Sequence, residues 1–115
     1  MTIIYHNPRC SKSRETLALL EANNIKAEPR LYLVDTPSED EIKALLIQLN
    51  ITAIELMRTK EALYKELELN TADITDEQRI SAMATHPKLI ERPIVIHNNK
   101  AKLGRPPAAV LDLFK

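Results

Sequence analysis

The chain has 115 residues, of which 44% are hydrophobic, and this size suits one compact domain and leaves no room for a second. Sixteen lysines and arginines balance sixteen aspartates and glutamates, so no bulk positive field is present to attract nucleic acid or an anionic membrane. We therefore expect neither partner, and any anion site must be local. The first residues contain no basic segment followed by an apolar run of signal-peptide length, which favours a cytoplasmic location.

Cysteine and histidine are both scarce. The single cysteine, Cys10, has no partner for an internal disulfide, and the three histidines at positions 6, 86 and 97 do not combine with it at any metal-site spacing. We expect no metal site. The neutral net charge and the short predicted strands indicate no obligate interface, so a monomer is the expected state.

The N-terminal third alternates between strand and helix patterns. A short β-prone run at residues 3–5 stops at Asn7, where a loop begins, and the next apolar pattern predicts a helix over about 11–23. Residues 27–34 are predicted to form a second strand. A strand, a helix and a strand within so short a distance favour a parallel crossover, with Cys10 at the junction of loop and helix.

Helix-capping motifs mark the middle of the chain. Capping boxes of the form S/T-x-x-E/Q begin at Ser38, Thr52 and Thr75. They predict three or four short helices within residues 38–85. The His86-Pro87 pair is expected to end the last of these helices, because a residue before proline is disfavoured in helical conformation.

Two strands and a helix are predicted after this block. Residues 93–96 and 100–103 are typical of strands joined by a tight Asn98-Asn99 turn. The sole glycine, Gly104, is expected to allow a sharp exit from the second strand. The prolines at 106 and 107 are suited to opening a final helix.

In chain order, the predicted elements are strand, helix, strand, helical block, strand, strand and helix. This order matches an α/β, thioredoxin-like fold (βαβ…ββα) with a central helical insertion. We therefore predict a single domain over residues 1–115, with the insertion at about residues 38–87.

Cys10 is the residue with the most distinctive chemistry. A cysteine in the first turn of a helix meets unpaired backbone N–H groups and the positive end of the helix dipole, which favour the thiolate and also bind oxyanions. Neighbouring hydroxyl and basic side chains add donors and positive charge. The alternative is that a lone cysteine is a small buried hydrophobic residue. The polar sequence RCSKSR around it argues against burial.

Five motifs are spread along nearly the whole chain. They are YHNPRCSKSRETL at residues 5–17, LYL at 31–33, LMR at 56–58, HPKLIERPIV at 86–95 and LGRP at 103–106. Together they resemble the glutaredoxin-coupled arsenate reductase (ArsC) family, within the ArsC/Spx superfamily. The resemblance implies a thioredoxin fold with a helical insertion, in agreement with the predicted elements.

The resemblance also implies roles for individual residues. Cys10 is implied as the nucleophile, and His6 lies in the same loop, where it would stabilise the thiolate as an imidazolium or orient the loop. Pro93 falls where thioredoxin-like folds carry a cis proline beside the active cysteine. Guanidinium groups suit an oxyanion that approaches a thiolate, because they are always charged and hold two oxygens at once. The implied substrate-binding residues are three arginines and one serine: Arg58, Arg92, Arg105 and Ser13.

The cysteine count constrains the implied mechanism. Reduction of arsenate to arsenite takes two electrons, which two thiols supply by forming one disulfide, so a chain with one cysteine needs an external thiol. The implied cycle uses Cys10 on arsenate, glutathione as co-substrate, and glutaredoxin to regenerate the thiol by exchange. It needs no bound cofactor.

Two other functions stay open. A glutathione-dependent thiol reductase of the same superfamily would use Cys10 on protein or glutathione disulfides, with the cationic pocket binding glutathione carboxylates. A regulatory or binding module would resemble the Spx-type transcription regulators, which bind RNA polymerase and carry a Cys-x-x-Cys redox switch. The second position of that switch is Ser13 here, so the switch itself is chemically absent.

Overall fold

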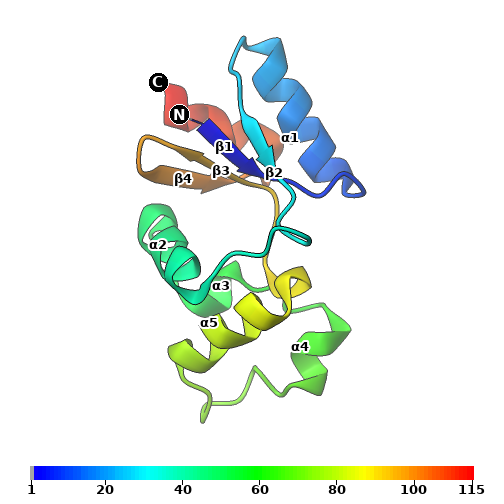
Figure 1. Cartoon of the computed structure of the whole chain (residues 1–115), viewed down its shortest axis with the longest axis vertical. Coiled ribbons are helices and arrows are strands. Elements are labelled where there is room, and N and C mark those ends of the chain that lie inside the picture. The colour runs from blue at the N-terminus through cyan, green and yellow to red at the C-terminus, as the bar shows by residue number, and fades with distance from the viewer. Residues whose placement is uncertain (1) are drawn as a thin grey trace. The chain divides into compact units, whose positions relative to one another are not determined.

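The computed structural model describes residues 2–115, which divide into two compact units (Figure 1). The first unit joins the two ends of the chain, up to Asp35 and from Arg92 onward, and the second unit is Thr36–Glu91. The second unit contains the helices predicted for the insertion, and its bounds lie a few residues outside the predicted 38–87. No helix within residues 2–115 has the length and apolar character needed to cross a membrane.

A four-stranded sheet forms the frame of the first unit. Its strands are β1 (Thr2–Tyr5), β2 (Glu28–Arg30), β3 (Ile94–His97) and β4 (Lys100–Leu103). The strand order is β2-β1-β3-β4, with β1 and β2 parallel and the other two pairs antiparallel. At the carboxyl end of β1, Tyr5 pairs with Arg30 on one side and with Ile94 on the other. The loop after β1 therefore starts between the end of β2 and the start of β3.

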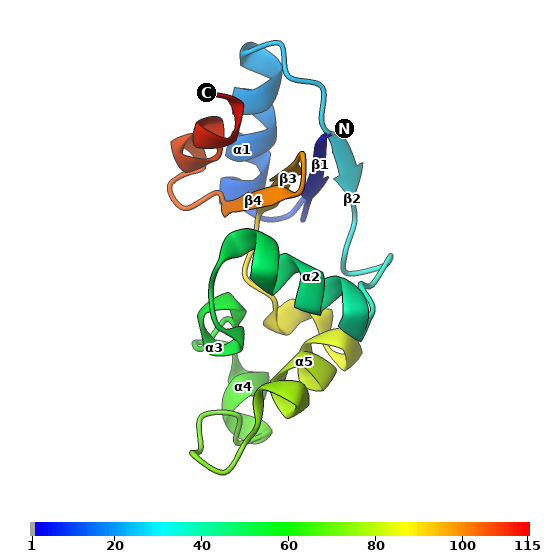
Figure 2. The ribbon, with the colours of Figure 1, turned by 90° about the vertical axis from the view of Figure 1, so that its left-hand side faces the viewer.

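Two helices cover one face of this sheet. α1 (Ser11–Ala22) packs against η2 (Pro107–Phe114), and both lie on the same side of the strands in Figure 2. Side chains from both helices and from the two central strands form a fully buried apolar cluster. The final helix was predicted in the right place, but it is a 3-10 helix. The cluster consists of Ile4, Leu20, Val95 and Val110.

The second strand is shorter than predicted. The prediction placed it over residues 27–34, but β2 ends at Arg30 because the carbonyl of Leu31 accepts hydrogen bonds from the N–H groups of Val34 and Asp35, at 2.9 and 2.7 Å. The chain therefore turns back on itself where the apolar pattern indicated extension. Within the turn Tyr32 is buried and stacks on Tyr5, with ring centroids 6.2 Å apart.

The β3–β4 hairpin has the predicted turn. Asn98 and Asn99 have φ values of 50° and 65°, in the left-handed region that asparagine tolerates better than most residues. A two-residue turn with both central residues in this region matches the twist of the flanking strands. His97 and Lys100 pair directly on either side of it.

The second unit is helical, and its helices begin at the predicted capping boxes. In each box the hydroxyl of the N-cap residue accepts from a backbone N–H three residues later, and that later side chain accepts from the N–H of the N-cap residue. The three pairs are Ser38 with Glu41, Thr52 with Glu55, and Thr75 with Gln78. The helices are α2 (Glu39–Leu49), α3 (Ala53–Leu56), α4 (Ala62–Glu66), α5 (Asp76–Thr85) and the 3-10 turn η1 (Pro87–Leu89).

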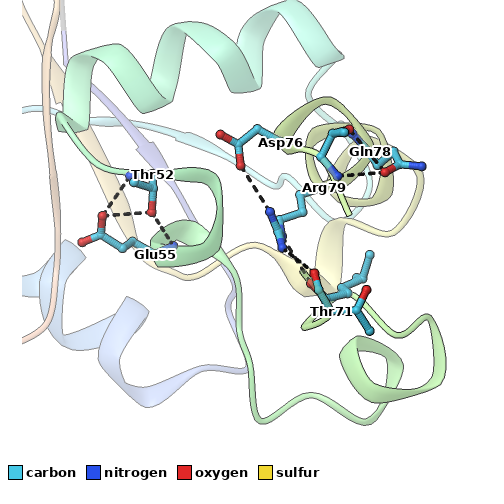
Figure 3. A network of polar contacts seen from close by, with 8 residues as sticks. Thr52, Glu55, Thr71, Asp76, Gln78 and Arg79 are labelled. Atoms are coloured by element: carbon cyan, nitrogen blue, oxygen red, sulfur yellow. Dashed lines mark hydrogen bonds and ion pairs between the residues drawn. The ribbon is translucent and has the colours of Figure 1, made fainter. Parts of the chain in front are cut away.

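A buried arginine connects α5 to the segment before it (Figure 3). Arg79 is only 7% exposed, and its Nε donates to the carbonyl of Leu69 at 3.2 Å. One terminal nitrogen donates to the carbonyl of Thr71 at 3.3 Å, and the other forms an ion pair with Asp76 at 3.3 Å. Arg79 thus ties α5 to the backbone of the preceding segment through hydrogen bonds to two carbonyls. The sequence pattern alone does not distinguish it from a surface arginine.

Candidate active site

Cys10 lies where the loop after β1 becomes α1. It is the N-cap residue of that helix, with extended backbone angles of φ −94° and ψ 123°. Its N–H donates to the carbonyl of Asn7 at 3.0 Å, and its own carbonyl accepts from Arg14 N–H at 3.0 Å. The Asn7 side chain also accepts from Arg9 N–H, at 3.0 Å, so the loop is closed by local hydrogen bonds. The thiol is therefore placed at the helix N-terminus, as predicted.

The thiol is more buried than the sequence indicated. Cys10 is 9% exposed, although the polar residues around it argued against burial. That expectation was wrong because α1 turns a polar face inward: Ser13 and Thr16, one turn apart, are fully buried. Burial and a polar surrounding therefore coexist at Cys10, and the alternative of a purely apolar cysteine does not describe its environment.

Hydrogen bonds and charge lower the pKa of the Cys10 thiol. Burial alone raises the pKa, but the rise is more than offset by other groups. The backbone N–H of Ser13 lowers it most, followed by the positive charge of Arg92, the backbone N–H of Lys12 and a hydrogen bond from the Arg92 side chain. The thiolate is thus stabilised by the helix N-terminus and by one arginine together.

We expect the alkylation rate of the wild-type protein to follow a titration with its midpoint below the ordinary thiol pKa of about 8.5. The midpoint should lie at lower pH because only the thiolate reacts, and a lowered pKa keeps the thiolate populated to lower pH. The measurement is the rate of iodoacetamide modification between pH 5 and 10, with the sole cysteine giving a single phase. A midpoint at or above 8.5 would show that Cys10 is not activated.

His6 and Ser13 are joined beside the cysteine. His6 Nδ1 and Ser13 Oγ share a buried hydrogen bond of 2.6 Å, and Ser13 Oγ also accepts from Asn7 N–H at 3.0 Å. Burial lowers the pKa of His6, and the positive charge of Arg14 lowers it further. The neutral imidazole is therefore favoured at neutral pH, which speaks against the imidazolium role. The contact with Ser13 instead fits a histidine that orients the loop.

Two of the three predicted arginines lie together in the same unit. Arg92 lies two residues before β3, and Nε of Arg105 donates to its backbone carbonyl at 2.9 Å. The peptide bond between Arg92 and Pro93 is cis, at the position where the family resemblance implies a cis proline, and the bond between Arg105 and Pro106 is cis as well. Arg92 is the arginine that lowers the pKa of the Cys10 thiol.

Arg58 belongs to the second unit. Its N–H donates to the carbonyl of Leu89 at 2.7 Å, and its guanidinium forms an ion pair with Glu61 at 3.3 Å. Lys88 approaches the other oxygen of Glu61 at 3.8 Å. Arg58 is thus part of a local charge network, and its assignment to the oxyanion site stays a prediction.

Gly104 has a different role from the one predicted. Its φ is not positive, so the chain leaves β4 here without the left-handed backbone that only glycine adopts freely. The residue is buried, and a Cβ built on it would lie 2.6 Å from Pro93 Cγ and 2.6 Å from Thr16 Oγ1. A glycine is needed there because two other segments approach its backbone closely. Sequence reasoning assigned no site role to Thr16 or Gly104, although both fall inside the motifs.

Comparison with known proteins shows the family to which the chain belongs. The ArsC family model matches residues 5–113. The chain belongs to the ArsC family. A solved structure described as an arsenate reductase from Vibrio cholerae superposes with a TM-score of 0.96 at 52% sequence identity, over 97% of this chain and 96% of that one. The thioredoxin-like α/β fold is thereby confirmed.

Curated ArsC relatives span the same length. An arsenate reductase of Haemophilus influenzae is 49% identical over 113 residues, covering 97% of both chains. The uncharacterized protein YfgD of Escherichia coli is 52% identical over 111 residues, covering 96% of this chain and 93% of its own. The relatives therefore include both proteins named for arsenate reduction and one without an assigned activity.

Proposed function

We propose that this chain is an arsenate reductase in which the Cys10 thiolate attacks arsenate, glutathione supplies the second thiol, and glutaredoxin regenerates the cysteine. The observation that carries the proposal is the lowered pKa of the Cys10 thiol at the N-terminus of α1, with Arg92 beside the sulfur. The same groups that stabilise a thiolate also attract an oxyanion, so nucleophile and substrate can share them. The arsenate reductases of about 50% identity support the choice of substrate.

The proposed reaction balances with two thiols. The Cys10 sulfur bonds to arsenic as one arsenate oxygen leaves as water, and the glutathione thiol then supplies the second sulfur. Arsenic gains two electrons and leaves as arsenite, while the two sulfurs lose two electrons and become a Cys10–glutathione disulfide. Glutaredoxin attacks this disulfide on the glutathione sulfur and releases the Cys10 thiol. No metal or bound cofactor takes part.

The predicted site residues have separate tasks in this proposal. Arg92 and Arg105 hold oxyanion oxygens with planar guanidinium forks, and Arg58 is proposed as the third arginine. Ser13 contributes to the substrate site and, with His6, fixes the loop around the nucleophile. The need for reduced glutathione fits the reducing environment of the cytoplasm, where we place the protein. We propose that it acts there as a monomer.

A coupled assay with systematic omissions tests the proposal. Loss of NADPH absorbance should require arsenate, glutathione, glutaredoxin and glutathione reductase together, because Cys10 supplies only one of the two sulfurs. Removing any one of them should reduce the rate to background.

Other outcomes would select a different function. Turnover of a small glutathione mixed disulfide without arsenate, and no arsenate-dependent NADPH loss, would replace the proposal by a thiol reductase. If a folded protein with a reactive Cys10 catalyses neither reaction, the regulatory or binding module becomes the favoured function. Direct binding to RNA polymerase would then test it.

A further inference from the structure

We propose that Gly104 and Thr16 are positioning residues, and that with Pro93 they form a close-packed junction that holds Arg92 against the start of α1. The junction is defined by these three buried residues: Gly104 directly follows β4, Thr16 belongs to α1, and Pro93 directly precedes β3. The inference rests on Cys10 being the reactive group of the proposed function. It concerns how the sulfur acquires its arginine partner, which the family assignment does not address.

The contacts at Gly104 leave no space for a side chain. A Cβ there would lie 2.6 Å from Thr16 Oγ1 and 2.6 and 3.3 Å from two ring carbons of Pro93. Separations of 2.6 Å are well inside van der Waals contact, so a methyl group would have to displace a neighbour. Only the absence of a side chain lets α1 and the start of β3 approach from two sides.

Neither neighbour can yield freely. The Thr16 hydroxyl donates to the carbonyl of Lys12 at 2.8 Å, so moving it breaks a partly buried hydrogen bond in the N-terminal half of α1. The Pro93 ring is rigid, and the Pro93 carbonyl accepts from Gly104 N–H at 2.9 Å. The junction is therefore fixed by packing and by hydrogen bonds on both sides.

The site residues are the immediate neighbours of this junction. Arg92 precedes Pro93, and Arg105 follows Gly104 and donates to the Arg92 carbonyl at 2.9 Å. Cys10 lies at the start of the helix that contains Thr16. A shift of Pro93 away from α1 would carry the Arg92 backbone with it and lengthen the contact of its guanidinium with the sulfur.

The decisive comparison is the thiol titration of the wild type and of Gly104→Ala. In the alanine variant we expect the iodoacetamide reaction at pH 5.5 to slow by about threefold to tenfold, because each unit by which the thiol pKa rises lowers the thiolate fraction about tenfold there. Val110→Ala is the matched control, since it removes buried apolar volume from the same unit away from Arg92. Its reaction rate should equal that of the wild type even though its thermal unfolding temperature is lowered.

A second variant keeps the proposal testable if Gly104→Ala does not fold. A folded Gly104→Ala protein with the wild-type titration overturns the proposal. If Gly104→Ala does not fold, Thr16→Ala takes its place, because it removes one wall of the junction without a clash; a slower reaction at pH 5.5 supports the proposal and an unchanged rate overturns it. The titration needs no arsenate, so a failure of the reductase proposal in the coupled assay is a separate result.

Discussion

Cys10→Ser should reduce arsenate-dependent NADPH oxidation by at least about a thousandfold, to the background of the coupled assay. The serine hydroxyl is far less ionised than the thiol near neutral pH, and it cannot form the disulfide with glutathione that completes the reduction. The substitution changes one atom at a buried N-cap position where serine is also a preferred residue, so the fold should be retained. Initial rates at saturating glutathione and glutaredoxin are the measurement.

Two controls make this result specific. The variant should unfold at a temperature close to that of the wild type, and Ser11→Ala, an exposed hydroxyl directly after the cysteine, should keep nearly the full rate. Substantial arsenate-dependent turnover by Cys10→Ser would contradict the assignment of the nucleophile, because the chain contains no other cysteine to take its place.

Arg92→Lys should lower kcat/KM for arsenate by about 10- to 100-fold while leaving the fold intact. Lysine keeps the charge but loses the planar fork that can hold an oxyanion oxygen and contact the sulfur at the same time. Because Arg92 also lowers the thiol pKa, the midpoint of Cys10 alkylation should move upward in the variant. The two measurements are arsenate kinetics in the coupled assay and thiol titration by iodoacetamide.

Arg9→Lys is the matched control for this substitution. Arg9 is exposed in the same loop, so the same change of head group there should alter neither the kinetics nor the titration. An Arg92→Lys protein with wild-type kcat/KM would remove Arg92 from the substrate site, whatever its effect on the thiol.

The elements that the sequence predicted well have strong local determinants. The three capping boxes and the Asn98-Asn99 turn are specified by residues close together in the chain, and the structure shows each in the expected conformation. The position of Cys10 at a helix N-terminus was predictable for the same reason. The motif resemblance then supplied the family, which the comparisons show.

The features that were missed depend on one local turn and on packing between distant segments. The apolar run from Leu31 to Val34 is typical of a strand, but the Leu31 carbonyl closes a turn there. The burial of Ser13 could not be read from a polar sequence, because it depends on what α1 packs against. The sequence analysis explained Gly104 by the conformational freedom of its backbone. In the structure a side chain is excluded there by Thr16 and Pro93, which are 88 and 11 residues away along the chain.

The three capping boxes of the helical unit differ in their sensitivity to acid. The boxes that begin α2 and α3 end in glutamates, and the box that begins α5 ends in Gln78, which does not titrate. The backbone N–H and the hydroxyl of Thr52 hold the pKa of Glu55 below its usual range. A carboxylate whose pKa is lower in the folded state stabilises fully above its unfolded-state pKa of about 4.3, and this stabilisation is lost as pH falls through the folded-state value. Acid therefore loosens the start of α3 while leaving the polar cap of α5 in place.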